Sequence, residues 1–328
     1  MLPMFKSVFA GLIACSLTLQ ALADPLPSWN ETDTKSAIVK FVTSVTDPDN
    51  DEFVPVASRI AVFDNDGTLW TEQPVYFQFI YALDVLKEKA KKDPGILDSP
   101  NLKAAVDGDL KTLMAGGMGA LQEVINASHA DISVTEFQQS VKQWLGRARH
   151  PKTNMRYDDM VYQPMLELLS YLRDNGFSTY IVSGGGQQFI RAFSDAAYGI
   201  PSQQVIGSAL HAKYEIVDDV PQITKKPDIA FVDDGPGKPV GIATVIGKKP
   251  IFVAGNSDGD FEMLEWGSSN SLPSLGVIVH HTDAKREYAY DTDSHIGKLD
   301  RGLKEADSRG WLLIDMKEDW AKIYPKAQ

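Results

Sequence analysis

The alternation of apolar and polar residues divides the chain into regions of different character. Near its start, Ile38, Val42 and Val45 recur with the spacing of one helix face, which predicts an amphipathic helix. Residues 58–63 form an apolar run that breaks at a polar segment containing glycine, as expected for a buried strand followed by a tight loop. After residue 164, short apolar runs alternate with helical patterns, and this alternation predicts a parallel α/β sheet.

The second half of the chain gives the most detailed prediction. We expect helices over 165–172, 187–197, 240–245 and 261–266, and strands over 177–182, 229–232, 250–254 and 276–279. Residues 70–160 differ, because apolar residues such as Phe77, Ile80, Leu83 and Leu86 follow a helical spacing and no strand pattern is convincing. We therefore predict an α/β protein with a helical insertion after its first strand.

The composition is that of a globular protein with a substantial core, because 43% of the 328 residues are hydrophobic and 23% are charged. The formal net charge is −12, and no block of lysine or arginine stands out. Nucleic acid and anionic membranes are therefore disfavoured as partners. Beyond the N-terminal segment, no apolar run approaches the roughly 18 residues of a membrane span, which excludes a multi-pass membrane protein.

The N-terminal segment has the pattern of a secretory signal peptide. Lys6 is the only charge before Asp24, and an apolar run over 7–22 ends in an A-x-A cleavage pattern. We therefore expect residues 1–23 to be removed and the protein to be periplasmic or secreted. An alternative stays open, because the only cysteine, Cys15, ends a segment that resembles a lipoprotein box and would then carry a lipid anchor.

Three of the predicted strands end in polar turns that contain glycine. These turns cover residues 64–68, 183–186 and 255–260. In an open parallel sheet, ligands bind outside the carboxyl ends of the strands, so the three turns are expected to converge on one site. The convergence of three such turns is a more specific signal than any one of them.

The side chains of these turns suggest phosphoryl chemistry that depends on a cation. Asp64 and Asp66 are held close by a turn, and two carboxylates so placed need a cation or a shared proton. Mg²⁺ suits them, and a carboxylate beside it can attack phosphorus while the other protonates the leaving oxygen and later activates water. Ser183, in a glycine-rich turn before a helix, can bind a phosphoryl oxygen, and a lysine is needed to balance the charge.

Taken together, these motifs resemble the haloacid-dehalogenase-like (HAD) phosphohydrolases. The matching residues are D-N-D-G-T-L at 64–69, S-G-G-G at 183–186, a lysine, and G-N-S-D-G-D at 255–260. The likeness covers about 59–69 and 164–279 and is greatest to the phosphoserine-phosphatase-like branch, whose helical cap is inserted just after the first motif.

This resemblance implies a division of the chain and the roles of its charged residues. The core would be a Rossmann-like parallel sheet with helices on both faces, formed by residues 24–69 and 161–328, and the cap would be residues 70–160. Asp64 would be the nucleophile and a Mg²⁺ ligand. Asp66 would be the general acid and base, with its backbone carbonyl as a second ligand. Lys238 would balance the charge, with Lys225 and Lys226 as the other candidates.

The remaining positions of the motifs would bind the phosphate and complete the metal site. Thr68 would orient the nucleophile loop, and Ser183 with Gly184 would bind phosphate. Asp260 would complete the metal site. Asn256 stands where the family usually has an aspartate, so either Asn256 is a weaker, uncharged ligand or the nearby Asp258 binds the metal.

Other chemically suggestive residues have an ordinary structural explanation beside the functional one. The segment His280-His281-Thr282-Asp283 could line the mouth of the site or bind a transition metal, but a surface loop is the preferred interpretation. Arg147, Arg149 and His150 could touch the far end of a substrate or form a solvated turn. Trp70 is expected to pack the cap onto the core.

The preferred prediction is an exported, Mg²⁺-dependent phosphomonoesterase that acts on a small phosphorylated metabolite through an aspartyl-phosphate. One alternative is a metal-independent dehalogenase of the same superfamily, against which the presence of Asp66 argues. The other is an exported binding protein that has lost catalysis, for which Asn256 is the support. The sequence predicts neither the substrate nor the oligomeric state.

Overall fold

The computed structural model describes residues 24–326 of the 328. The predicted signal peptide and Cys15 therefore lie outside the described residues, and the expectation of export remains a prediction. Within residues 24–326, no helix is both long and apolar enough to cross a membrane.

The described chain folds into strands and helices whose order alternates as the sequence predicts. The strands are β1 (Ile60–Phe63), β2 (Ser178–Gly186), β3 (Val205–Val217), β4 (Val220–Phe231), β5 (Phe252–Gly255), β6 (Leu275–Thr282), β7 (Ala289–Tyr290) and β8 (Leu312–Asp315). The α-helices are α1 (Asp33–Thr46), α2 (Phe77–Lys92), α3 (Pro100–Asp107), α4 (Leu110–Ala115), α5 (Gly117–His129), α6 (Val134–Leu145), α7 (Gln163–Asp174), α8 (Gln187–Arg191), α9 (Ser194–Tyr198), α10 (Gly237–Val245), α11 (Phe261–Ser268), α12 (Arg301–Arg309) and α13 (Met316–Asp319).

The sheet is mostly parallel, which confirms the predicted fold class. Its strand order is β4-β3-β2-β1-β5-β6-β7, and β8 pairs with β6 beside this path. The central strand β1 is parallel to both neighbours, and Phe63 at its end lies level with Ile181 of β2 and Ala254 of β5. The loops that follow these strands therefore leave the sheet at the same edge.

Helices pack on both faces of the sheet because β1 sends alternate side chains to opposite sides. Ala61 and Phe63 belong to a core shared with α1 and α7, whereas Ile60 and Val62 belong to a second core shared with α10 and α11. All four residues of β1 are buried, as expected for a parallel strand covered on both faces.

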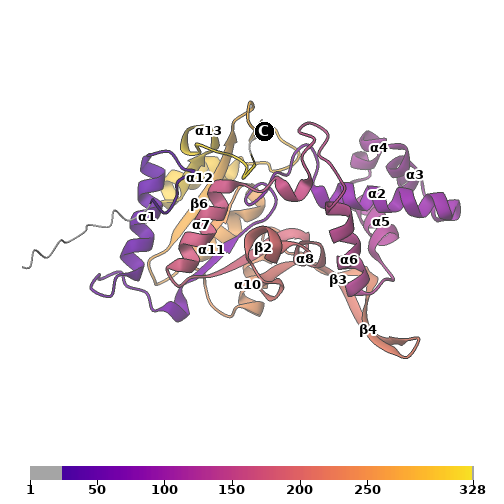
Figure 1. Cartoon of the computed structure of the whole chain (residues 1–328), viewed down its shortest axis with the longest axis horizontal. Helices are drawn as coiled ribbons and strands as arrows, with labels where there is room; N and C mark the ends of the chain where they lie inside the picture. The colour runs from indigo at the N-terminus through magenta and orange to yellow at the C-terminus, as the bar shows by residue number, and fades with distance from the viewer. Residues whose placement is uncertain (1–23, 327–328) are drawn as a thin grey trace, which may run out of the picture.

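The segment from 70 to 160 contains the five helices α2 to α6, as its spacing predicts. Figure 1 shows α2 to α5 at the end of the molecule opposite α1. Leu86, Leu102 and Val124, from three of these helices, share a small hydrophobic core of their own. Helix α6 begins at a capping box in which Ser133 and Glu136 satisfy each other's backbone groups.

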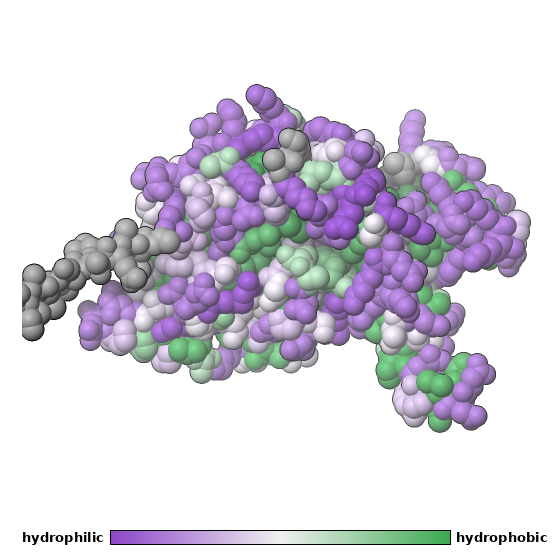
Figure 2. Space-filling view, in the orientation of Figure 1, coloured by the Kyte–Doolittle hydropathy of each residue, from purple (hydrophilic) through white to green (hydrophobic). Residues whose placement is uncertain are grey.

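The strand prediction for 229–232 is too short, because β3 and β4 form a long antiparallel hairpin. The hairpin projects from the sheet edge at the lower right of Figure 1, and its tip shows exposed apolar residues in Figure 2. Asp218 and Asp219 both have positive φ, which suits the tight two-residue turn between the strands. The hairpin also contacts the cap, since backbone hydrogen bonds join Lys225 to Asp131 and Ile132.

Two smaller differences complete the comparison. The helix predicted over 187–197 is broken into α8 and α9 at Phe193, and α12 with β8 was not predicted.

Candidate active site

The loop after β1 holds Asp64 in a fixed backbone conformation. The Asp64 N–H donates to the carbonyl of Ala254 in β5 at 2.9 Å, and the Gly67 N–H donates to the carbonyl of Trp70 at 2.8 Å. Gly67 has φ +71°, and a Cβ there would lie 2.1 Å from the side-chain nitrogen of Asn256. Glycine is therefore required both by the backbone conformation and by the lack of space.

Lys238 joins the first and third turns. It lies in the first turn of α10 and is 1% exposed. Its Nζ is 2.9 Å from Oδ1 of Asp64 and 2.5 Å from Oδ1 of Asp260, and it donates to the carbonyl of Val182 at 3.1 Å. Burial alone would lower the pKa of Lys238, but the two carboxylates raise it, so the lysine stays charged.

The other two candidate lysines lie on β4. Lys225 packs over the ring of Phe137, and Lys226 pairs with Glu215 at 3.1 Å. The structure thus brings Lys238 to Asp64.

Asp64 sits in an environment rich in negative charge. Burial raises its pKa well above the usual range, the charge of Asp260 adds to this rise, and Lys238 opposes it. Asp66, two residues further on, accepts a hydrogen bond from Nε1 of Trp70 at 2.9 Å. Burial raises the pKa of Asp66 too, while the Trp70 hydrogen bond lowers it. Trp70 is buried and stacks on Phe193 with ring centroids 4.6 Å apart, so the expected packing role is joined by a contact with the acidic pair.

Ser183 lies in the last part of β2, where the pairing with β3 begins to shift register. Its Oγ accepts the N–H of Gly185 at 3.1 Å, which leaves the hydroxyl proton free to donate elsewhere. Gln78 of the cap accepts the N–H of Gly186 at 2.6 Å. Ser183 and Gly184 line the same cavity as Asp64 and Asp66.

Asn256 uses both ends of its side-chain amide within the protein. Its Oδ1 accepts from Oγ1 of Thr68 at 3.2 Å, and its Nδ2 donates to Oε1 of Glu72 at 2.7 Å. Thr68 is fully buried and is not among the residues that line the cavity, and its hydroxyl instead holds Asn256, which suits its predicted role in orienting the loop. Asp260 accepts the backbone N–H groups of Asn256 and Ser257, which fixes the third turn around Lys238.

Asp258, the alternative to Asn256, faces away from the site. Its carboxylate accepts the N–H of Asp300 at 3.1 Å and the N–H of Gly302 at 3.0 Å, at the start of α12. It therefore caps the N-terminus of α12.

Glu72 was missed by the sequence analysis. It is buried, lines the same cavity as the acidic pair, and accepts hydrogen bonds from Asn256 and from the hydroxyl of Tyr290 at 2.7 Å. Burial raises its pKa well above the usual range, and the charges of Asp66 and Asp64 add to this effect. No motif marks Glu72, because its partners are brought to it only by the fold.

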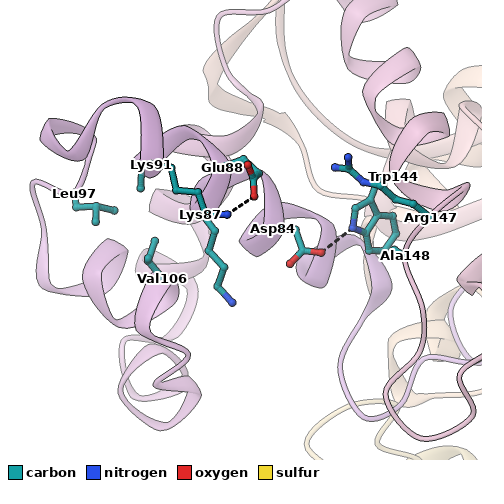
Figure 3. Close-up of a pocket in the computed structure, with 10 residues that line it drawn as sticks. Asp84, Lys87, Glu88, Lys91, Leu97, Val106, Trp144, Arg147 and Ala148 are labelled. Carbon is teal, nitrogen blue, oxygen red and sulfur yellow. Dashed lines mark hydrogen bonds and ion pairs between the residues drawn. The ribbon is translucent and has the colours of Figure 1, made fainter.

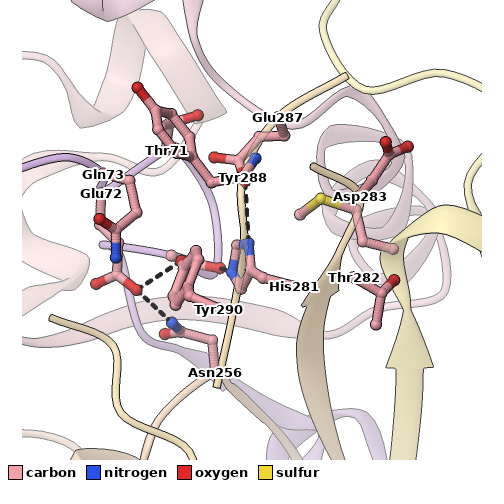
Figure 4. A network of polar contacts seen from close by, with 12 residues as sticks. Thr71, Glu72, Gln73, Asn256, His281, Thr282, Asp283, Glu287, Tyr288 and Tyr290 are labelled. Carbon is pink, nitrogen blue, oxygen red and sulfur yellow. Dashed lines mark hydrogen bonds and ion pairs between the residues drawn. The ribbon is translucent and has the colours of Figure 1, made fainter. Parts of the chain in front are cut away.

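His281 belongs to the same polar network, which Figure 4 shows. Its Nε2 lies 2.8 Å from the carbonyl oxygen of Gly67, its Nδ1 lies 3.3 Å from Glu287, and its ring stacks on Tyr290. The interpretation of this segment as a surface loop is therefore wrong for His281, which is buried against the nucleophile loop.

The cavity has a volume of about 360 Å³ and lies where the sheet edge, the cap and the hairpin meet. Its lining includes Asp64, Asp66, Ser183, Gly184 and Lys238 from the core, Glu72, Phe79, Leu121 and Phe137 from the cap, and Lys225 and Phe231 from the hairpin. Within residues 24–326, no three His, Cys, Asp or Glu side chains are grouped so as to hold a metal ion by themselves.

A second depression, of about 620 Å³, is lined by cap residues alone and is shown in Figure 3. It contains Arg147 beside the hydrogen bond from Trp144 to Asp84. His150 is buried, with Nε2 3.0 Å from the carbonyl oxygen of Gln73. Neither residue lines the cavity at Asp64, so a contact of either with the substrate gains no support.

Comparison with known proteins gives one family and a similar fold. The family model described as haloacid dehalogenase-like hydrolase matches residues 61–265, more than half of the chain. No curated protein matches the sequence. A functionally unknown protein from Anaerococcus prevotii is similar in structure, with a TM-score of 0.59 and 15% identity over 92% of this chain and 97% of that one.

Two further solved structures are less similar. A protein of unknown function from Bordetella pertussis has a TM-score of 0.49 and 16% identity over 79% of this chain and 98% of its own. A probable phosphoserine phosphatase from Vibrio cholerae has a TM-score of 0.36 and 15% identity over 79% of this chain and 67% of its own.

Proposed function

Because this chain belongs to the haloacid dehalogenase-like hydrolases, we propose that it is a Mg²⁺-dependent phosphomonoesterase that acts on a small phosphorylated metabolite through an aspartyl-phosphate. The observation that carries the proposal is the contact of Lys238 with Asp64 and Asp260 at the floor of a cavity that also exposes Asp66 and Ser183. A nucleophile, an acid, a hydroxyl donor and a fixed cation then face one small space.

The proposed first step transfers the phosphoryl group to the protein. A carboxylate oxygen of Asp64 attacks phosphorus, and the bond from phosphorus to the leaving oxygen breaks. Asp66 gives its proton to that oxygen, and Trp70 holds the carboxyl in place. The hydroxyl of Ser183 donates a hydrogen bond to a phosphoryl oxygen, and Lys238 offsets the negative charge beside Asp64.

The proposed second step returns the nucleophile. Asp66, now ionised, takes a proton from a water molecule whose oxygen attacks phosphorus. The bond between phosphorus and Asp64 breaks, and inorganic phosphate leaves. A cavity of about 360 Å³ favours a small substrate over a polymer.

The charge of the site fits the expected cation. Lys238 contacts the carboxylates of Asp64 and Asp260, and two further buried or half-buried carboxylates, those of Asp66 and Glu72, line the same cavity. Asp64 and the main-chain carbonyl of Asp66 would hold Mg²⁺, and Glu72 is the further carboxylate in the same cavity. When bound, Mg²⁺ would neutralise the acidic pair and withdraw charge from the phosphoryl group. The amide of Asn256 is already engaged by Thr68 and Glu72, so we assign it an orienting role.

Asp66 separates this proposal from a dehalogenase. A haloalkanoate needs no proton for its leaving halide, whereas a phosphate ester needs one for its leaving oxygen. The hydrogen bond from Trp70 keeps Asp66 at the cavity, where it can deliver that proton.

Hydrolysis of p-nitrophenyl phosphate by the purified protein tests the function. We expect turnover with Mg²⁺, its loss in EDTA, and its loss in Asp64→Asn. Asp258→Asn is the matched control, because it neutralises a carboxylate of the third turn that serves α12, and it should remain active. Full activity of Asp64→Asn would refute the mechanism, and Mg²⁺-independent release of halide from haloacids would favour the dehalogenase.

A further inference from the structure

The cavity has a basic wall at the end formed by the cap and the hairpin. Lys225 on β4 and His129 at the end of α5 both line it, together with aromatic and aliphatic side chains such as Phe79, Ile125 and Phe137. The same cavity reaches Asp64. A ligand with its phosphate at Asp64 would thus place its other end against Lys225.

Lys225 is buried without an anionic partner. It is 6% exposed, and its backbone is held by hydrogen bonds to Asp131 and Ile132. Its Nζ lies 3.2 Å from the ring centroid of Phe137, and among residues 24–326 it makes no hydrogen bond or ion pair. A buried ammonium group that lacks a counterion is costly, and a ligand anion would remove that cost.

His129 beside it adds no negative charge. Its Nδ1 lies 2.5 Å from Oγ of Ser128, and that hydroxyl donates to the carbonyl of Val124 at 2.6 Å. The hydroxyl oxygen therefore accepts from Nδ1–H, and Nε2 keeps a free lone pair with no partner among the described residues.

The charged side chain that acts on Lys225 is another lysine. Lys89 of α2, which donates to the carbonyl of Ala127, faces the same region. Burial and then the charge of Lys89 lower the pKa of Lys225 to about 7. Burial, Lys225 and Lys89 together lower the pKa of His129 well below its usual value. Asp131 acts on Lys89, but among the described residues no carboxylate raises the pKa of Lys225 or of His129.

We propose that the substrate is a phosphomonoester whose far end carries a carboxylate, and that the Lys225 ammonium binds this carboxylate while the phosphate lies at Asp64. The apolar walls between the two ends suit a hydrocarbon or aromatic spacer. This substrate class rests on the proposed phosphatase function, but the anion subsite at Lys225 can be tested without turnover.

The kinetic test compares 4-carboxyphenyl phosphate with 4-carbamoylphenyl phosphate, which have nearly the same shape and differ in charge. The purified protein should prefer the carboxylate ester by about tenfold or more in kcat/KM, the discrimination expected of one charge-assisted contact. Lys225→Met should abolish this preference, because it should lower kcat/KM for the carboxylate ester about tenfold more than for the carbamoyl ester. Lys226→Met is the matched control, because Lys226 pairs with Glu215 outside the cavity, and it should keep the preference.

The binding test uses 4-(phosphonomethyl)benzoate, which is not hydrolysed, in calorimetry with two buffers of different ionisation heat. At about pH 8, a bound carboxylate should draw a proton onto Lys225, so proton uptake should accompany binding and be absent in Lys225→Met. The Met variant removes a buried charge and should fold, and Lys225→Gln serves as a second neutral variant.

The outcomes separate the two proposals. An equal loss for both esters in Lys225→Met, or unchanged proton uptake, would show that Lys225 only supports packing and would overturn the subsite. The phosphatase function would be refuted if no phosphomonoester were turned over. The anion subsite would still stand if binding of 4-(phosphonomethyl)benzoate took up a proton through Lys225.

Discussion

The contact between Asn256 and Glu72 makes a sharp prediction about Asn256→Asp, the change that restores the residue usual in the family. In this structure, the side-chain nitrogen of Asn256 donates to a buried carboxylate oxygen of Glu72 at 2.7 Å. Aspartate would replace that donor by a second acceptor. Tyr290 would remain as one donor to Glu72, and one hydroxyl proton cannot satisfy two carboxylates.

The repulsion follows from the distance. Two unit charges 2.7 Å apart repel by about 6 kcal/mol at an effective dielectric constant of about 20 and by about 1.5 kcal/mol in bulk water. Proton uptake relieves part of this, because a shared proton suits a carboxylate pair. Asn256→Asp should therefore lower the free energy of unfolding by roughly 2–6 kcal/mol near pH 8 without divalent metal, and by less near pH 5.

Urea denaturation of four proteins measures this coupling. The set is the wild type, Asn256→Asp, Glu72→Gln and the double variant, in which the hydrogen bond can form with its direction reversed. The double variant should recover most of the stability that Asn256→Asp loses. Asn256→Ala removes the amide without adding charge, and its loss of about 1–3 kcal/mol isolates the missing hydrogen bond. Adding Mg²⁺ should recover part of the Asn256→Asp loss, since a cation offsets the added charge.

Two results would refute the reasoning. One is an Asn256→Asp protein as stable as the wild type near pH 8. The other is an additive double variant, because the two side chains would then not interact in solution.

Three further predictions concern neighbouring parts of the site. Trp70→Phe keeps the stacked ring but removes the donor to Asp66, so kcat should fall about tenfold with little change in KM; an unchanged kcat in steady-state assays would contradict the positioning role. Burial raises the pKa of Asp233 from 3.8 to about 7, so the folded state keeps a proton that the unfolded state loses, and stability falls as the pH rises from about 4 to about 7 and then levels off. Asp233→Asn should therefore be more stable than the wild type near pH 8, by up to about 4 kcal/mol, and the gain should shrink near pH 5; a pH-independent difference in denaturation curves would contradict this. Gly67→Ala should cost more than about 2 kcal/mol of stability because its Cβ would overlap neighbouring side chains, whereas Gly247→Ala, with the same sign of φ and open space, should cost about 1 kcal/mol; equal melting temperatures would contradict the difference.

The parts of the site that the sequence reveals are those encoded locally. The apolar run before Asp64 identifies β1, and the turn chemistry after it identifies the loop, because both signals come from adjacent residues. The position of Lys238 between two motifs was enough to select it, and the structure brings it within 2.9 Å of Asp64. Parallel pairing of β1 with β2 and β5 then accounts for the convergence of the three turns.

The hairpin escaped prediction for a physical reason. Its strands carry charges among their apolar residues, such as Lys213 and Glu215, because much of its surface faces solvent. Its turn uses Asp218 and Asp219 in place of the Asn-Gly pair that usually marks such a connection. In the sequence Lys225 is one of two adjacent lysines that were alternatives to Lys238, and only the packing of β4 against α6 shows that it is buried.

The departure at Asn256 has a different meaning in the structure from the one that it has in the sequence. Read along the chain, it suggests a site that lacks one negative charge. Its partner Glu72, however, lies 184 positions away in the sequence and brings a buried carboxylate within 2.7 Å of the Asn256 amide. The carboxylate is thus supplied by Glu72, next to position 256 in space. Because Glu72 also binds Tyr290, whose ring stacks on His281 beside the carbonyl of Gly67, this carboxylate joins the start of the cap to the nucleophile loop. An aspartate at position 256 would belong to the third turn of the core. Glu72 instead belongs to the start of the cap, so the position of this carboxylate in the site depends on the position of the cap.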